Sequence, residues 1–219
     1  MNGPAKSLSG ILLRVKRAGE GGRAAVMLSK EEGRQNLYVS RGVLQACGAG
    51  GMLPFAEVTA QIRSGEEISF VSQYDSRILL NLMAVPYEEM EQWYFLAELM
   101  MALFPEGTGD AAVLSILKKA LLLAEQRNRT IIAFMAAVQV LTRAGYDLCQ
   151  EEPAEKLRLS SGGRSLLKAF QQYPWQGALG KAVKESTFRE CARYMEAFLE
   201  LYCDLRLQTR EAFLKKTHT

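Results

Sequence analysis

The sequence predicts an α+β protein with two domains, a small closed β-barrel followed by an all-α helical bundle. Through the first third of the 219-residue chain, apolar and polar residues alternate with a period near two, and short Gly-containing turns separate the alternating runs. From about residue 76 onward, apolar residues recur instead with the period of about 3.6 that is typical of helices. This change of period predicts one domain over residues 1–78 and a second over residues 79–219.

Five strands are expected in the first domain, over residues 11–16, 24–28, 37–39, 55–63 and 67–74. Strict alternation along the first strand would put Leu12 on the same face as Arg14 and Lys16. The opposite face would carry Ile11, Leu13 and Val15. Five short strands with turns between them fit a closed barrel such as the five-stranded OB fold, because closure removes the edges that a flat meander would leave unpaired.

Helices are expected in the second domain over residues 86–103, 111–125, 130–144 and 164–172, with a last long helix from Thr187. The helix over residues 130–144 is almost wholly apolar, which indicates the buried centre of a bundle. Thr187 and Glu190 have the spacing of a capping box. Residues 149–164 are polar and contain Pro153, so a loop or short hairpin is expected there. Phe55 is expected in the core. Trp93, Tyr94, Phe95 and Met100–Met101 are also expected there, with the lining of a groove for a partner's apolar tail as the alternative.

The most informative segment is Lys6 to Arg41, which carries eight basic and three acidic residues. This excess of five positive charges on a small sheet favours a polyanion over a small-molecule ligand. The candidate phosphate contacts are Arg14, Lys16, Arg17, Arg23, Lys30, Arg34 and Arg41. A solvated basic face without a ligand is the alternative. Tyr38 alternates outward from its neighbours, so it can stack on a base or pack against an adjacent strand.

The sequence contains no recognisable catalytic or metal-binding pattern. Its one histidine, His218, lies at the end of the chain, and no phosphate-binding GxxxxGK[ST] loop occurs. The four cysteines are widely spaced, so we expect reduced thiols in apolar surroundings, no zinc and no other cofactor. We therefore expect a protein that is not an enzyme.

Neither a signal peptide nor a membrane span is expected. The N-terminal residues lack an apolar segment of signal-peptide length. The longest apolar runs, near Ala133–Val140, are too short to cross a bilayer. A cytoplasmic location without membrane attachment is the resulting expectation.

The order of several short motifs is similar to that of the RecO family of bacterial recombination mediators. In the first domain these motifs are Gly10–Arg14, Gly19-Glu20, Ser29–Arg34, Arg41-Gly42 and Leu53–Phe55. In the second they are Ala144–Leu148 and the ending Leu205–Leu214. Each motif is weak alone, and their order and spacing carry the resemblance.

The resemblance implies an N-terminal OB domain that binds DNA and a helical domain that binds partners. It further implies a non-enzymatic protein that binds single- and double-stranded DNA and anneals complementary strands. The implied partners are RecR and the C-terminal tail of the single-stranded-DNA-binding protein SSB, which together help to load recombinase onto gaps. A nucleoid-associated location in the cytoplasm follows from that role.

Three departures from the family pattern bear on function. A four-cysteine zinc module, which many members carry after the segment that corresponds to Ala144–Leu148, is missing. Residues 43–51 carry no charge where the family has a basic loop, and Phe134–Ala137 occupies the place of paired basic residues. Arg127 and Arg129 are then the candidates for binding the acidic SSB tail. These departures motivate a second hypothesis, a protein-interaction scaffold of the same fold with weakened DNA binding.

Overall fold

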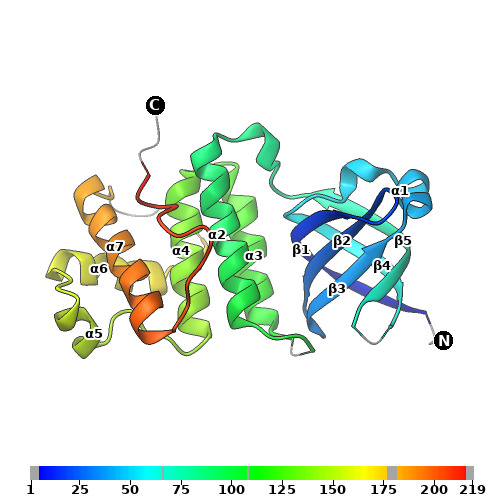
Figure 1. Ribbon diagram of the computed structural model, residues 1–219. Helices are drawn as coiled ribbons and strands as arrows, with labels where there is room; N and C mark the ends of the chain where they lie inside the picture. The colour runs from blue at the N-terminus through cyan, green and yellow to red at the C-terminus, as the bar shows by residue number, and fades with distance from the viewer. Residues whose placement is uncertain (1–4, 66, 108, 177–181, 216–219) are drawn as a thin grey trace. The chain divides into compact units, whose positions relative to one another are not determined.

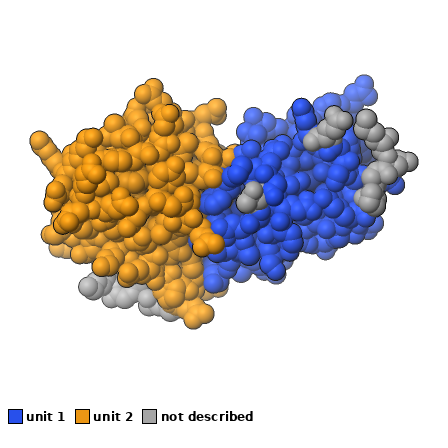
Figure 2. All heavy atoms as spheres, turned by 90° about the horizontal axis from the view of Figure 1, so that it is seen from below, with its two compact units in different colours: residues 1–84, 104–122 blue, residues 85–103, 123–219 orange. Residues whose placement is uncertain are grey.

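The computed structural model describes residues 5–65, 67–107, 109–176 and 182–215 (Figure 1). The chain forms two compact units, one of residues 1–84 with 104–122 and one of residues 85–103 with 123–219 (Figure 2). Residues 104–122 thus belong to the first unit, although residues 85–103, which precede them in the sequence, belong to the second. The sequence-based division into a DNA-binding domain over residues 1–78 and a partner-binding domain over residues 79–219 stays a prediction.

The first unit contains a closed five-stranded barrel, which confirms the predicted fold. Its strands are β1 (Lys6–Ala18), β2 (Gly22–Ser29), β3 (Gly33–Val39), β4 (Ala56–Arg63) and β5 (Ser69–Ile78). Their order around the barrel is β1-β2-β3-β5-β4, and β4 returns to β1. Among the pairs of these five strands, only β3–β5 is parallel. A helical connection and strand β4 lie between β3 and β5 in the sequence. This is the arrangement of an OB fold.

Strand β1 closes the barrel because it belongs to two ladders. Residues Lys6–Ile11 pair with β4, and residues from Gly10 onward pair with β2. Gly10 lies where the two ladders overlap, and a Cβ atom there would come within 2.3 Å of the Leu28 carbonyl oxygen. Only glycine therefore fits this crossing without a shift of the backbone.

A β-bulge in β1 makes the strict alternation expected from the sequence wrong. The register with β2 shifts between Leu12 and Arg14, so Leu13 has no direct partner. One extra residue changes which side of the strand the next side chain faces. As a result Leu12 and Val15 both pack in the barrel core, whereas Arg14 and Lys16 both point outward.

The barrel core is largely apolar. Its largest members come from all five strands and include Leu8, Met27, Leu37, Val58 and Ile62. Tyr74 also packs there, and its hydroxyl donates to the Gly48 carbonyl oxygen at 2.8 Å. Burial raises the pKa of Tyr74, so the phenol stays protonated and keeps this donor.

Residues 43–51, expected as a loop, instead form two short helices at one end of the barrel (Figure 1). These are α1 (Arg41–Cys47) and the 3-10 helix η1 (Ala49–Gly51). The Ser40 hydroxyl accepts a hydrogen bond from Val43 N and caps α1. Leu44 points into the core. Val43 and Cys47 are partly buried against the same core, whereas Gln45, Ala46 and Gly48–Gly50 are exposed.

The remaining helices are η2 (Leu82–Ala84), α2 (Tyr87–Leu103), α3 (Ala111–Ala124), α4 (Arg129–Arg143), α5 (Glu151–Lys156), α6 (Ser161–Gln171) and α7 (Glu185–Tyr202). The prediction that α4 is buried is confirmed, since every residue from Ile132 to Leu141 is buried. Phe134 of α4 makes edge-to-face contacts with Phe170, Phe188 and Phe213. Phe55, Trp93 and Phe95 are buried as expected.

Two helical predictions are wrong. Residues 149–164 are not a loop or hairpin, because they hold α5 and the start of α6. The last helix starts at Glu185, so Thr187 and Glu190 form no capping box. The Glu190 carboxylate instead accepts hydrogen bonds from Ser160 N at 2.6 Å and Ser160 Oγ at 2.8 Å. Ser160 caps α6, so Glu190 joins α7 to the start of α6.

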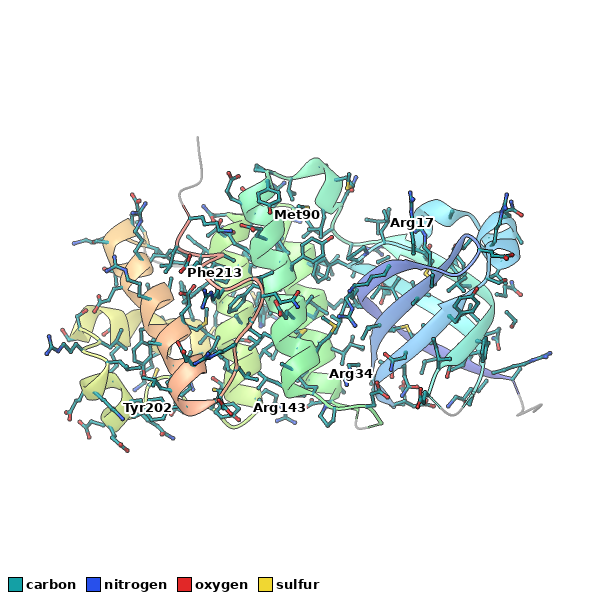
Figure 3. The ribbon with its side chains drawn as sticks, viewed as in Figure 1. Arg17, Arg34, Met90, Arg143, Tyr202 and Phe213 are labelled. Carbon is teal, nitrogen blue, oxygen red and sulfur yellow. The ribbon has the colours of Figure 1, made fainter. Side chains whose placement is uncertain are left out.

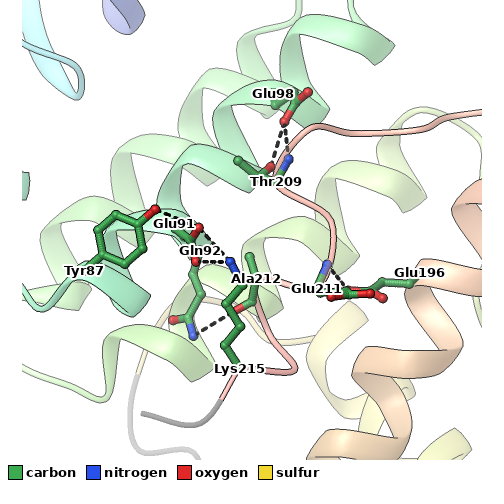
Figure 4. Close-up of polar contacts among 9 residues, drawn as sticks. All are labelled: Tyr87, Glu91, Gln92, Glu98, Glu196, Thr209, Glu211, Ala212 and Lys215. Carbon is green, nitrogen blue, oxygen red and sulfur yellow. Dashed lines mark hydrogen bonds and ion pairs between the residues drawn. The ribbon is translucent and has the colours of Figure 1, made fainter. Parts of the chain in front are cut away.

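The C-terminal segment lies against α2 and α7 of the second unit (Figure 4). The Glu98 carboxylate accepts from Gln208 N and from Thr209, and Lys215 Nζ pairs with Glu91 at 2.6 Å. Glu211 N donates to Glu196, whose carboxyl has a pKa raised by burial. Together with buried Phe213, these contacts make the segment part of the helical fold.

Among the described residues, no helix is both long enough and apolar enough to span a bilayer.

Substituting Gly10 tests the role of the β1 crossing. Gly10→Ala is expected to lower the free energy of unfolding by about 1–3 kcal/mol, because the new methyl group meets backbone that packing holds in place. Gly50→Ala is the matched control, since no atom lies within 4 Å of a Cβ at that position. Urea unfolding followed by circular dichroism measures both, and equal stability of the two variants would contradict the account.

Candidate nucleic-acid interface

Outward-facing side chains from all five strands form two rows on the barrel surface. Cross-strand pairing defines the rows, since each member is the direct register partner of the next. The first row is Arg14, Val26 and Asn36. The second row is Lys16, Ala24, Tyr38, Phe70 and Arg63. We call the cationic, aromatic and amide members of these rows the outward face: Arg14, Lys16, Asn36, Tyr38, Arg63 and Phe70.

A shallow groove of about 370 Å³ follows β2 across this face. The small side chains of Ala24 and Val26 line it between the flanking strands. Arg14 and Lys16 lie along its β1 side, and Asn36 lies along its β3 side. Glu67 and Ile68, from the turn between β4 and β5, complete the lining.

The predicted phosphate contacts do not all lie together. Arg14 and Lys16 are exposed and share the groove. Arg17 and Arg34 lie at opposite ends of β2, as Figure 3 shows. Arg41 lies beside the β1–β2 turn, since its Cδ would be 3.2 Å from a Cβ on Gly21.

Ion pairs reduce the charge at the other end of the barrel. Arg34 Nη2 lies 3.7 Å from the Glu106 carboxylate, and Lys6 Nζ lies 2.7 Å from that of Glu32. Lys30 is exposed in the turn between β2 and β3. The strongest concentration of outward cations is therefore the β1 side of the groove and the adjoining β1–β2 turn.

Arg23 is a structural cation and not a member of the outward face. Its register partner on β3 is Val39, a core residue, so its side chain shares the inward orientation. Arg23 Nη1 donates to the Met52 carbonyl oxygen. A hydrogen bond from a charged donor to buried backbone stabilises the fold near η1 and fixes the guanidinium at the barrel end.

Tyr38 packs against a neighbouring strand, which was one of its two expected roles. Its ring meets that of Phe70 edge to face, with centroids 6.0 Å apart and planes at 71°. Sequence reasoning missed Phe70, Arg63 and Asn36. The alternation of β5 places Phe70 between Ser69 and Val71 and could have shown that it faces outward. Its place beside Tyr38 depends on the parallel β3–β5 pairing, which barrel closure creates.

The structure separates the two predicted partner-binding arginines. Arg129 Nη1 pairs with Glu89 at 3.3 Å, whereas Arg127 is exposed just before the α4 cap Asn128. A groove of about 340 Å³ lies beside the start of α4. Its lining includes Asn128, Ile131, Phe188, Arg189, Phe213 and Lys215.

Within the described parts of the chain, no group of three or more His, Cys, Asp or Glu residues could hold a metal ion. The four cysteines are unpaired. Burial raises the pKa of the Cys191 thiol to about 12 and that of Cys203 to about 11, so both are protonated at neutral pH. The absence of zinc and other cofactors stays a prediction.

The fold and the interface define a class of protein, an OB barrel with a basic, aromatic outward face joined to a helical unit. No family model matches the chain. It is similar to a DNA repair protein RecO from Pelotomaculum thermopropionicum, with 27% identity over 138 residues. The match covers 62% of this chain and 54% of that protein, so the chain spans about half the length of the relative. This similarity supports a RecO-like relationship.

Replacing single arginines separates structural from surface cations. Arg23→Ala is expected to lower the free energy of unfolding by about 1–3 kcal/mol, because it removes a charged donor from the Met52 carbonyl. Arg14→Ala removes an exposed side chain and is expected to change stability by no more than about 0.5 kcal/mol. Thermal or urea unfolding distinguishes them, and an Arg23 variant as stable as the wild type would show that the contact contributes nothing.

Proposed function

We propose that the protein is a DNA repair mediator of the RecO type that binds DNA on the outward face of its barrel. The observation that carries this proposal is the groove in which Arg14 and Lys16 lie together, both facing solvent because the bulge in β1 lets Leu12 and Val15 pack inward. Phosphates are neutralised by such exposed lysines and arginines, and the counterions they release drive binding. The name of the similar protein, a DNA repair protein, points to the same class of activity.

In this proposal the protein binds single- and double-stranded DNA and promotes annealing of complementary strands. Cations along β1 and at the β1–β2 turn lower the repulsion between phosphates of two strands that approach each other. Together with RecR, the protein would then help to load recombinase onto DNA coated with SSB. Its place of action would be the cytoplasm, at the nucleoid.

The helical unit offers a separate surface for the acidic SSB tail. The groove beside the start of α4 is lined by the apolar side chains of Ile131 and Phe188, and its cations Arg189 and Lys215 are themselves paired with Glu185 and Glu91. The N-terminal end of a helix also favours negative charge. Arg127 is close in sequence to this groove, whereas the charge of Arg129 is already paired with Glu89. The helix end, exposed Arg127 and the apolar lining support an acidic, partly apolar partner.

The alternative is a protein-interaction scaffold of the same fold with weakened DNA binding. Two observations favour it. Residues 43–51, which correspond to a basic loop in the family it resembles, carry no charge here and form η1 and most of α1. Arg34 and Lys6 also contact carboxylates of Glu106 and Glu32, which lowers the net positive field at that end of the barrel.

Salt dependence of DNA binding tests the proposal. The double variant Arg14→Ala with Lys16→Ala should lower the slope of log affinity against log salt by about 1.4 for single strands, at about 0.7 per phosphate lost. The measurement is a titration of fluorescently labelled oligonucleotides at several salt concentrations.

A matched double variant supplies the control. Lys168→Ala with Arg193→Ala removes two exposed cations from the helical unit and should leave the slope unchanged. If the slope of log affinity against log salt falls in this control but not in the barrel variant, the DNA site lies on the helical unit. Wild-type binding that is absent or insensitive to salt near 50 mM would favour the scaffold.

A further inference from the structure

We propose that Tyr38 and Phe70 form a base-stacking platform that makes the outward face prefer single-stranded DNA over duplex. This inference rests on the proposed function, because it requires that the outward face binds DNA. It adds a preference for single-stranded DNA and assigns this preference to Tyr38 on β3 and Phe70 on β5. Stacking on an aromatic ring needs an unpaired base with an open face, which a duplex does not offer.

The first argument is the exposure of Phe70. Phe70 is 51% exposed, whereas Val71 and Tyr74 of the same strand lie in the core. An aromatic ring that stays in water does not contribute the favourable free energy of burying its apolar surface. A base that stacks on the ring would cover this surface.

The second argument is that the two rings are held in place before any ligand arrives. Their edge-to-face contact fixes their relative orientation. The Tyr38 hydroxyl lies over the β1–β2 hairpin, since a Cβ on Gly22 would come within 2.7 Å of it. The Phe70 ring lies beside Gly65, where a Cβ would be 3.4 Å from Cε2. A platform ordered in advance loses little conformational entropy on binding.

The third argument is the position of charge around the platform. Lys16 and Arg63 lie at the two ends of the row that contains Tyr38 and Phe70. With strands about 4.8 Å apart, this row covers roughly 19 Å of barrel surface, enough for several nucleotides. Cations at both ends can contact the phosphates on either side of a base stacked at the centre.

The polar lining of the groove favours one placement of the strand. Arg14 and Lys16 attract phosphates to the β1 side, while Glu67 repels them from the opposite side. Glu67 can accept hydrogen bonds at exposed base edges, and so can the Asn36 amide oxygen, while the Asn36 amide nitrogen donates to Glu106. Phosphates are therefore favoured beside Arg14 and Lys16 on β1 and beside Arg63 on β4, with a base over β3 and β5 between them. In a duplex the base faces are covered, and the second phosphate backbone would meet Glu67.

Phe70 variants test the platform with single-stranded and duplex oligonucleotides of equal length. Phe70→Leu keeps an apolar side chain but has no aromatic ring, and Phe70→Ala removes both. Both variants should weaken single-strand binding by about 5- to 150-fold, the range for loss of one stacked base. Duplex binding should change less than about twofold, with the salt slope unchanged, because no phosphate contact is lost.

Ile78→Ala serves as the control, since Ile78 is another exposed apolar residue of β5, and thermal unfolding checks that each variant folds. The platform is overturned if Phe70→Leu binds single strands as the wild type does. It is also overturned if single-strand and duplex affinities fall equally. In both cases wild-type DNA binding, and with it the proposed function, would stand. Wild-type protein that binds neither form of DNA would overturn the proposed function itself.

Discussion

The bulge at Leu13 is the constraint on which the candidate interface depends. Strand β1 pairs with two different neighbours and must bend between them to close the barrel. The bulge supplies local twist at this place, and it also reverses the side-chain alternation. Leu12 and Val15 can then both fill the core while Arg14 and Lys16 both reach solvent. The same irregularity that bends the strand thus keeps both cations out of the core.

Barrel closure brings the remaining members of the face together from distant parts of the sequence. Tyr38 and Phe70 are 32 positions apart and become neighbours through the parallel β3–β5 pairing. In the helical unit, by contrast, the carboxylates of Glu98, Glu190 and Glu196 accept hydrogen bonds that hold the chain to itself. These acids have a structural role in the unit.

Sequence reasoning found the architecture but not its local exceptions. Periodicity and turn residues gave the five strands and the buried α4, because these follow from repeated local patterns. The bulge at Leu13 and the packing of α1 depend on closure, which no local pattern encodes. Arg23 has the same charge as Arg14, and only its register with core residue Val39 shows that it serves the fold. Phe70 was missed as a site residue because its partner Tyr38 is adjacent in space alone.

Photocrosslinking tests the central claim that single-stranded DNA lies across the β3–β5 part of the outward face. An oligonucleotide that carries 5-iodouracil would be irradiated with the wild-type protein, and the modified peptides identified by mass spectrometry. The account predicts adducts on Tyr38 and Phe70, whose rings lie on adjacent strands. Adducts confined to aromatic residues of the helical unit, such as Tyr173 and Trp175, would contradict it.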